Sequence, residues 1–296
     1  MFLIVGAGFL GTYLIRQLSA QFRGPILATV RDTASVVPFP KTEYVAFDVT
    51  DETDVRRLAK RCGGGKLTVF YFAALHNVDY LYTHREEGEN VNLTALARFL
   101  DAVPGIEKFF FASTDCVYGE NAPGSQKFKE TDECKPINVY GAQKLEAEKI
   151  VRAHGFTAVR FSYMMGPSLT KKRHFYDTLE AKLKAGEPVE MLDGMVRSAL
   201  SYKTAALLLA ELSALPAGVL PDTVNLCSDG AFTKYDLGLK IAADCGVSPA
   251  LVKKIPESAG EAFFKDRRAS RAVMDNERLK ALLGLSHIGF EEVTRC

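Results

Sequence analysis

The sequence Phe2-Leu-Ile-Val-Gly-Ala-Gly-Phe-Leu-Gly11 decides the fold of the N-terminal half of the chain. Its four leading apolar residues are typical of a buried strand, and its glycines have the spacing G-x-G-x-x-G directly before an amphipathic helix. Gly6 permits a tight turn, Gly8 lets the backbone approach a pyrophosphate, and Gly11 allows the helix to pack closely on the strand. Because a helix N-terminus also offers N–H groups and a positive dipole to phosphates, the stretch predicts a dinucleotide-binding turn rather than a mere tight turn.

Beyond this turn, short β-branched or aromatic runs alternate with longer helical patterns, which is typical of parallel strands connected by helices. Strands are predicted at Phe2–Val5, Ile26–Val30, Tyr44–Phe47, Leu67–Phe72, Lys108–Ala112 and Thr157–Phe161. Helices are predicted at Leu10–Gln21, Val55–Arg61, Asn90–Ala102 and Ile137–Ala153. The strands are apolar on both faces, as expected when helices cover each side of a sheet. The predicted class is α/β, with a Rossmann-type doubly wound parallel sheet over residues 1–165.

After Gly166-Pro167 the rhythm changes to longer helical stretches separated by short extended pieces. Helices are predicted at Phe175–Ala185, Tyr202–Ala214 and Lys234–Cys245, with strands at Val189–Leu192 and Thr223–Leu226. Residues 166–296 are therefore expected to form a smaller α/β lobe that binds the substrate, from which the chain could re-enter the first domain.

Composition narrows the class of protein. The 296 residues include 37 basic and 36 acidic ones, without a long run of one sign, so nucleic acid is not an expected partner. The six cysteines are scattered with no C-x-x-C pair, which fits neither a disulfide framework nor a zinc site, and no cluster predicts any metal. The apolar run before Gly6 is too short for a signal peptide, and that from Ala205 to Leu220 is too short to cross a bilayer. We expect a cytoplasmic protein without membrane contact.

The end of the second strand faces the adenosine ribose in this fold and therefore selects the dinucleotide. Arg31 can pair with a 2′-phosphate, which favours NADP(H), whereas the neighbouring Asp32 keeps NAD(H) as an alternative. Alternatively, Arg31 and Asp32 form only a solvated turn and have no role in selecting the cofactor. After the third strand, Asp48 could accept a hydrogen bond from the adenine amino group, or it could act only as a turn residue that caps a helix.

The catalytic candidates are Thr114, at the end of a central strand, and Tyr140 and Lys144 on the next helix. Residues four apart share one helix face, so the Lys144 ammonium would stabilise a Tyr140 phenolate and lower the pKa of the phenol toward neutrality. Tyr140 could then donate a proton to a carbonyl oxygen that Thr114 holds by a hydrogen bond while hydride arrives at carbon. Tyrosine and lysine at this spacing are usually solvated surface, but their order after a glycine turn and a Ser-Thr strand end favours catalysis.

Seven segments together resemble the extended short-chain dehydrogenase/reductase family, and within it the dTDP-4-dehydrorhamnose reductase branch. The segments are Gly6-Ala-Gly-Phe-Leu-Gly11, Asp48-Val-Thr-Asp51, Phe72-Ala-Ala74, Asn90-Val-Asn-Leu-Thr94, Ser113-Thr-Asp-Cys-Val-Tyr-Gly119, Tyr140-Gly-Ala-Gln-Lys144 and Arg160-Phe-Ser-Tyr-Met-Met-Gly-Pro167. The resemblance implies a catalytic triad of Thr114, Tyr140 and Lys144, with Lys144 also holding the nicotinamide ribose. It implies cofactor contacts from Gly6, Gly8, Phe9, Leu10, Gly11, Arg31, Asp48, Val49, Ala73, Ala74, Asn90, Tyr140 and Lys144.

The resemblance implies that the substrate is a nucleotide-linked sugar or a similar carbonyl compound. A homodimer is a further expectation for this protein. Asp115, His76 and Arg197 are the substrate-binding candidates, although His76 could be an ordinary loop residue. The basic stretch Lys171-Lys-Arg-His174 could attract a diphosphate-bearing substrate or be a solvated loop. The sequence departs from the family where an acidic residue is expected after Tyr202, and its glycine turn is one residue shorter than the commonest form.

Three functions follow from these residues. A reductase comes first, and an epimerase that uses tightly held NAD as a transient hydride store has the same triad. A dehydratase is disfavoured, because in this family it has Asp-Glu after the threonine. Here Asp115 is followed by Cys116, whose thiol is mostly protonated at neutral pH. The third is a non-catalytic NADP-binding regulatory subunit of another enzyme, because the substrate lobe departs from the family pattern.

Overall fold

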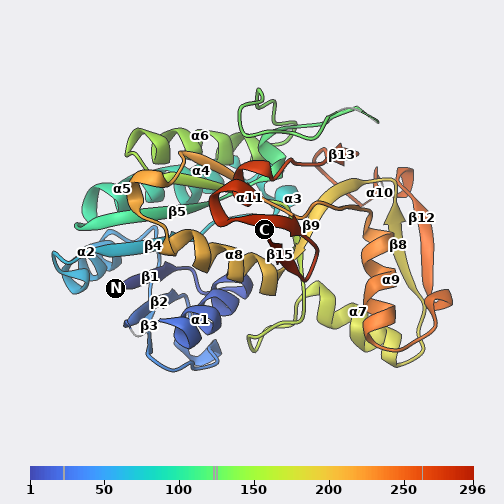
Figure 1. Cartoon of the computed structure of the whole chain (residues 1–296), viewed down its shortest axis with the longest axis horizontal. Coiled ribbons are helices and arrows are strands. Elements are labelled where there is room, and N and C mark those ends of the chain that lie inside the picture. Colours follow the sequence, from blue (N-terminus) through green and yellow to red (C-terminus); the bar gives the residue numbers. More distant parts are fainter. Residues whose placement is uncertain (23, 123, 125, 262) are drawn as a thin grey trace.

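A computed structural model describes residues 1–22, 24–122, 124, 126–261 and 263–296, and its centre is a seven-stranded sheet (Figure 1). The strands lie in the order β10-β6-β5-β4-β1-β2-β3, and each neighbouring pair is parallel. Their bounds are β1 Phe2–Val5, β2 Ile26–Val30, β3 Thr42–Ala46, β4 Leu67–Tyr71, β5 Ile106–Thr114, β6 Thr157–Phe161 and β10 Thr223–Leu226. This confirms the predicted doubly wound parallel sheet.

Helices cover both faces of the sheet because successive strand side chains point to opposite sides and are apolar on each. Ile4 packs with helices α1 and α8, whereas Leu3 and Val5 pack with α2, α5 and α6 (Figure 1). The edge strand β3 differs from the prediction, since it is half-buried to exposed and has a strand neighbour on one side only. The helices have the bounds α1 Phe9–Gln21, α2 Glu52–Cys62, α5 Ala95–Ala102, α6 Val139–Ala153, α8 Tyr202–Ala214 and α11 Glu277–Leu283.

The strand order places a crevice at the carboxyl ends of β1 and β4. From β1 the chain continues outward to β2 and β3, and from β4 it continues in the opposite direction to β5 and β6. The connections after β1 and β4 therefore diverge, which opens the site where such sheets bind ligands. The glycine turn follows β1, and residues 72–75 follow β4 at the same edge.

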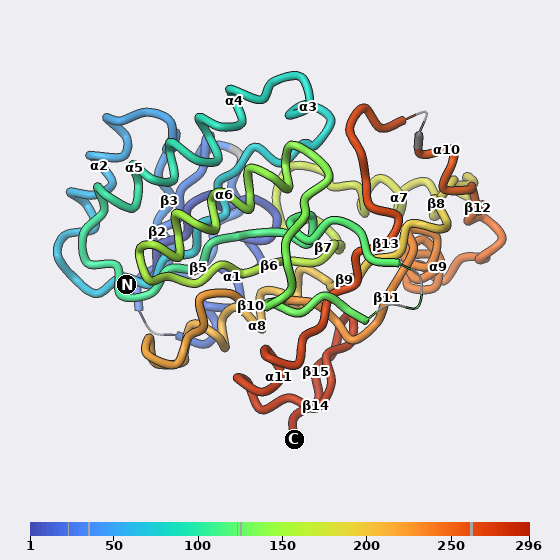
Figure 2. The backbone as a smooth tube through the Cα atoms, turned by 90° about the horizontal axis from the view of Figure 1, so that it is seen from above, coloured from blue at the N-terminus to red at the C-terminus, as the bar shows by residue number. Residues whose placement is uncertain are grey.

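The remaining elements form a smaller lobe on one side of the sheet (Figure 2). Strands β8 (Val189–Asp193) and β12 (Val252–Pro256) pair in parallel and pack with α7 (Phe175–Lys184) and α9 (Lys234–Asp244) around buried Leu183 and Ile241. The central strand of a second small sheet is β9 (Val196–Ser201), whose partners are β7 (Tyr163–Met165), β11 (Ala231–Phe232) and β13 (Arg271–Ala272). Shorter elements are α3 Val78–Thr83, α4 Arg85–Glu89, α10 Ser258–Glu261, β14 Leu285–Ile288, β15 Val293–Arg295 and several single helical turns.

After residue 166 the chain returns to the large sheet, and α8 and β10 are the clearest examples. Helix α8 packs along α1, and β10 pairs with β6 from Thr223 to Leu226. The apolar face of α8 explains this return, since Leu208, Leu209 and Leu212 are fully buried against the sheet. The predicted boundary at residue 165 divides the sequence into two continuous segments. In the structure, parts of the second segment pack with the first.

Candidate functional site

The three glycines of the turn meet three different steric demands. Gly6 has a φ of +92°, and a Cβ there would lie 2.9 Å from the backbone nitrogen of Ala73 after β4. A Cβ on Gly11 would lie 2.9 Å from the Gly6 carbonyl oxygen, so this position sets the close approach of α1 to β1. A Cβ on Gly8 would meet nothing within 4 Å, because Gly8 faces open space at the N-terminus of α1. A closed turn with one open glycine at a helix N-terminus fits a pyrophosphate.

The residues predicted at the adenosine end lie at the ends of β2 and β3. Arg31 is exposed, and Asp32 begins a helical turn by accepting a hydrogen bond from the Ala34 amide at 2.9 Å. Asp48 accepts from the Thr50 amide at 2.8 Å and from its hydroxyl at 2.7 Å, while Val49 is buried. Asp48 therefore supports a local turn, and its contact with adenine stays a prediction.

The loop after β4 is held by an asparagine that the sequence reasoning missed. Asn92 is buried, accepts from the Leu75 amide at 2.9 Å and donates to the Leu75 carbonyl at 3.0 Å. It also donates to Gln143 of α6 at 2.9 Å, so it links the loop that carries Ala73 and Ala74 to the catalytic helix. Asn90, the predicted cofactor contact, is exposed, and its contact with the cofactor stays a prediction. Asn92 could have been identified from the sequence, because its amide lies on an otherwise apolar face of the predicted helix.

The structure brings the three catalytic candidates together at the carboxyl ends of the strands of the large sheet. Thr114 ends β5, Tyr140 lies in the first turn of α6, and Lys144 follows one turn later. Asn138 caps this helix by accepting from the Gly141 amide at 2.8 Å. Lys144 is buried and donates to the Ala112 carbonyl at 2.7 Å, with its ammonium 5.9 Å from the Tyr140 ring centre.

The electrostatics of the pair differ from the prediction. Burial, Cys116 and Asp115 raise the pKa of Tyr140, against the hydrogen bond with Thr114 that lowers it. Burial lowers the pKa of Lys144 to about 7, with Glu148 opposing that shift. The Lys144 ammonium bonds the Ala112 carbonyl rather than the phenol, so it does not bring the pKa of Tyr140 down here. Tyr140 is accordingly held protonated, which is the state of a proton donor.

Two of the residues predicted to bind substrate, Asp115 and Arg197, form an ion pair with each other. Arg197 of β9 forms an ion pair with Asp115 at 2.7 Å, and both side chains are largely buried. Burial opposes the charge on Arg197, but Asp115 outweighs it and raises the pKa of the guanidinium. Burial and Asp115 also raise the pKa of the Cys116 thiol to about 11, so Cys116 cannot serve as the base of a dehydratase at neutral pH. The pair ties the catalytic strand end to the small lobe.

Cations that the sequence reasoning did not select lie beside this ion pair. Lys234, at the start of α9, is half-buried, and burial together with the charges of Arg197 and Arg268 lowers its pKa. Arg268 pairs with Asp79 at 2.9 Å, and Asp79 also accepts from the Lys265 amide at 2.8 Å. Asp79 thus fastens the 265–268 segment to the start of α3.

His76, the remaining substrate candidate, is exposed after β4. Its pKa is lowered by partial desolvation and by the charges of Lys144 and Arg31, with a backbone hydrogen bond to Ala74 opposing the shift. Its contact with substrate stays a prediction.

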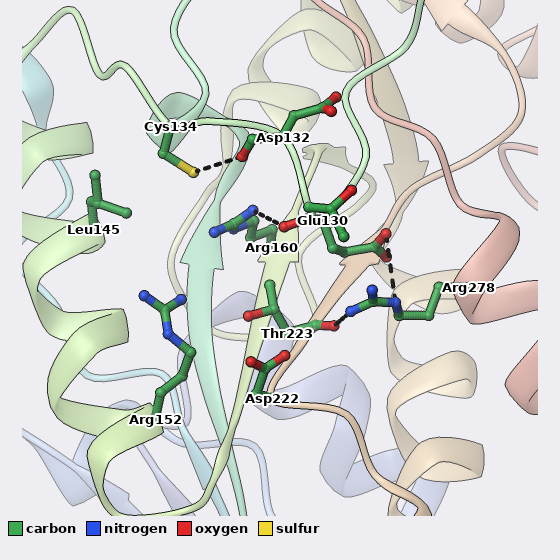
Figure 3. A pocket seen from close by; sticks show the side chains of 10 residues that line it. Glu130, Asp132, Cys134, Leu145, Arg152, Arg160, Asp222, Thr223 and Arg278 are labelled. Atoms are coloured by element: carbon green, nitrogen blue, oxygen red, sulfur yellow. Dashed lines mark hydrogen bonds and ion pairs between the residues drawn. The ribbon is translucent and has the colours of Figure 1, made fainter.

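Helix α6, which carries Tyr140 and Lys144, is anchored by Glu148, which is fully buried. Its carboxylate accepts from Arg160 of β6 at 2.7 and 2.9 Å, from Arg152 at 2.9 Å and from the Ser113 hydroxyl. Both arginines line a cavity of about 450 Å³, which Figure 3 shows, and Cys134 and Arg278 line other parts of it. The network joins α6, β5 and β6 one turn from Lys144, so it fixes the triad in place.

Within the described residues, no group of three or more His, Cys, Asp or Glu has the arrangement of a metal site. Over those same ranges, no helix combines the length and apolar character that crossing a membrane requires.

Comparisons with known proteins converge on one group of enzymes. The family model described as "RmlD substrate binding domain" matches residues 1–295. A glycan biosynthesis protein of Haloferax volcanii, Agl12, is 31% identical over 159 residues, which cover 50% of this chain and 49% of that protein. The chain spans about half the length of such curated relatives.

Two solved structures share the fold. The UDP-glucose 4-epimerase of Thermus thermophilus, solved with NAD, has a TM-score of 0.79 and 21% identity, covering 95% of this chain and 92% of that one. The dTDP-4-dehydrorhamnose reductase of Bacillus anthracis, solved with NADP, has a TM-score of 0.75 and 18% identity, covering 98% and 94%.

Proposed function

This chain belongs to the RmlD substrate binding domain family, and from that membership we propose that it is an NAD(P)-dependent oxidoreductase that reduces a carbonyl group of a nucleotide-linked sugar. The observation that carries the proposal is the meeting of Thr114, Tyr140 and Lys144 beside the glycine turn, with Tyr140 held protonated. A protonated phenol next to a hydroxyl is suited to a substrate oxygen that gains negative charge.

The chain's own residues account for the proton side of the reaction. A nicotinamide dinucleotide, when bound at the glycine turn, supplies hydride to the carbonyl carbon. The Thr114 hydroxyl holds the carbonyl oxygen, and Tyr140 donates its proton to that oxygen as the C=O bond becomes an alcohol. Lys144, held on the Ala112 carbonyl one helical turn from Tyr140, would hold the nicotinamide ribose. One hydride and one proton thus complete the reduction.

NADP(H) is the cofactor we favour, with NAD(H) as the alternative. Arg31 stands at the end of β2, where a 2′-phosphate would lie, and its side chain is exposed to receive one. The neighbouring Asp32 is engaged with the Ala34 amide rather than directed solely at a ribose. Solved structures of the same fold contain either dinucleotide.

Epimerisation is the second candidate, because epimerases share this fold and the triad is compatible with it. The two reactions differ in net chemistry, since a reductase consumes NADPH in proportion to product and an epimerase consumes none. A non-catalytic regulatory role, a cytoplasmic location and a homodimer stay predictions. Native mass measurement of the purified protein would reveal a second copy or an unrelated partner.

The decisive experiment incubates the purified protein with a 4-keto sugar nucleotide and NADPH that carries deuterium at the transferable position. We expect one NADPH consumed per alcohol formed and deuterium on the product carbon. Isomerised sugar with no NADPH consumed would favour the epimerase instead. Failure to bind either nicotinamide nucleotide would contradict both enzymatic proposals.

A further inference from the structure

The basic stretch Lys171-Lys-Arg173 lies beside the adenosine end of the crevice rather than near the catalytic residues. It belongs to the segment between β7 and α7, which reaches back toward α1 (Figure 1). The Lys171 ammonium donates to the Ala34 carbonyl at 2.8 Å, although the two residues are 137 positions apart. Ala34 belongs to the turn that follows Arg31 and Asp32. The small lobe therefore contacts the loop that selects the dinucleotide.

Both ends of this segment are fixed on the glycine turn and its helix. At one end, the Tyr13 hydroxyl of α1 donates to the Pro167 carbonyl at 2.8 Å. At the other, the His174 ring packs edge-on against Phe9 with ring centres 4.5 Å apart, and its Nε2 hydrogen-bonds Tyr202 at 3.1 Å. The position of Lys171 is thus set by packed groups on either side.

Of the acidic side chains near these cations, Asp32 accepts from the Ala34 amide in the turn itself, and Asp177 is engaged at the start of α7. Asp177 accepts from the Ser168 and His174 amides at 2.9 and 2.5 Å, which fastens the turn at the start of α7. Lys171, Lys172 and Arg173 are exposed, as is Arg31 across the crevice. Lys171 therefore brings a cation of the small lobe to the turn that follows Arg31, and Lys172 and Arg173 come next to it in sequence. A phosphomonoester, which is close to a dianion at neutral pH, is the ligand group that such a cluster stabilises best.

We propose that Lys171, supported by Lys172 and Arg173, completes with Arg31 a site for the 2′-phosphate of NADP(H), so that both lobes select the cofactor. This inference rests on the proposed function, because it assumes a nicotinamide dinucleotide at the glycine turn. It assigns the basic stretch to the adenosine ribose instead of to a substrate diphosphate. Cofactor choice then depends on the contact of the small lobe with the Ala34 turn.

The test measures equilibrium binding, not turnover, by calorimetry with 2′,5′-ADP, 5′-AMP and UDP as probes. Lys171→Gln removes the charge but keeps much of the side-chain length, and Lys182→Gln, an exposed lysine of α7, is the matched control. We expect Lys171→Gln to weaken 2′,5′-ADP binding by about tenfold, the loss of one charge-assisted contact. Binding of 5′-AMP and of UDP should stay unchanged, and Lys182→Gln should match the wild type. Lys171→Arg should restore most of the lost affinity.

Other outcomes separate this inference from the proposed function. Equal weakening of 2′,5′-ADP and 5′-AMP, or weakening of UDP alone, would overturn the 2′-phosphate assignment and leave the reductase intact. Wild-type protein that binds NADPH and NADH equally well would overturn it too. Wild-type protein that binds neither would contradict the proposed function itself. Circular dichroism of each variant excludes loss of fold as the cause.

Discussion

Around Thr114 and Tyr140, buried groups hold one another through hydrogen bonds and ion pairs, whereas Lys171 to Arg173 are exposed and contact the first lobe through the Lys171 ammonium. The first region rests on a sheet edge and a capped helix, and the second spans two lobes on a loop. Reaction chemistry needs groups fixed within fractions of an ångström, while recognition of a phosphate needs only enough cations at the right place. The difference suggests that substitutions in the first region change rate and stability, and those in the second change only affinity.

The largest effect should come from Tyr140→Phe, which keeps the ring and removes the proton that reaches the substrate oxygen. We expect kcat for carbonyl reduction to fall by about 10²- to 10⁴-fold, the usual contribution of a positioned acid. NADPH binding should stay within about twofold of the wild type by fluorescence titration, since the ring and Lys144 remain. A variant with unchanged kcat would show that another group supplies the proton.

Glu148→Gln should be next, because it leaves Arg160 buried with a neutral partner. We expect the free energy of unfolding to fall by about 3 kcal/mol, as for other broken buried ion pairs, measured by urea titration. Glu146→Gln, on the exposed face of the same helix, breaks a surface pair with Lys149 and should cost under about 1 kcal/mol. Equal losses in both variants would show that the network does not anchor α6.

The pH dependence of stability tests the burial of Lys144. Its pKa in the folded protein, about 7, lies below the ordinary value near 10.5, so the unfolded chain binds more protons between these two pH values. The free energy of unfolding of the wild type relative to Lys144→Met should therefore rise with pH above 7, by up to about 1.4 kcal/mol per pH unit. Parallel stability curves for the two proteins would mean that Lys144 titrates normally.

The smallest effect expected is that of Lys234→Met, on the substrate side of the small lobe. Lys234 lies near Arg197 and Arg268, which form ion pairs with Asp115 and Asp79, so we expect a substrate diphosphate there to be bound mainly by the Lys234 ammonium. We expect KM for the sugar nucleotide to rise by about tenfold with kcat nearly constant, and stability to change little. Lys240→Met on the same helix, which pairs with Glu291, is the control. A fall in kcat instead would place Lys234 with the catalytic group.

Several features of the sheet were predictable because their causes are local in sequence. The strands Phe2–Val5, Ile26–Val30 and Thr157–Phe161 agree with the structure residue for residue, since each is a short apolar run bounded by breaks. Strand β5 continues through Ser113 and Thr114, two residues past its predicted end. Ladder pairing with Arg160 and Phe161 extends it, and a partner strand cannot be read from the run itself.

By itself, the sequence determined the glycine turn, the alternation of strands and helices, and the order of Thr114, Tyr140 and Lys144, because each depends on neighbours within one or two elements. Only the tertiary structure decided that Arg197 pairs with Asp115, that Asn92 holds the loop after β4, and that Lys171 reaches Ala34. These contacts join residues far apart in the chain, and their energies depend on distance and burial. The distances between these residues and their burial are set only when the two lobes pack together, so the sequence alone does not show them.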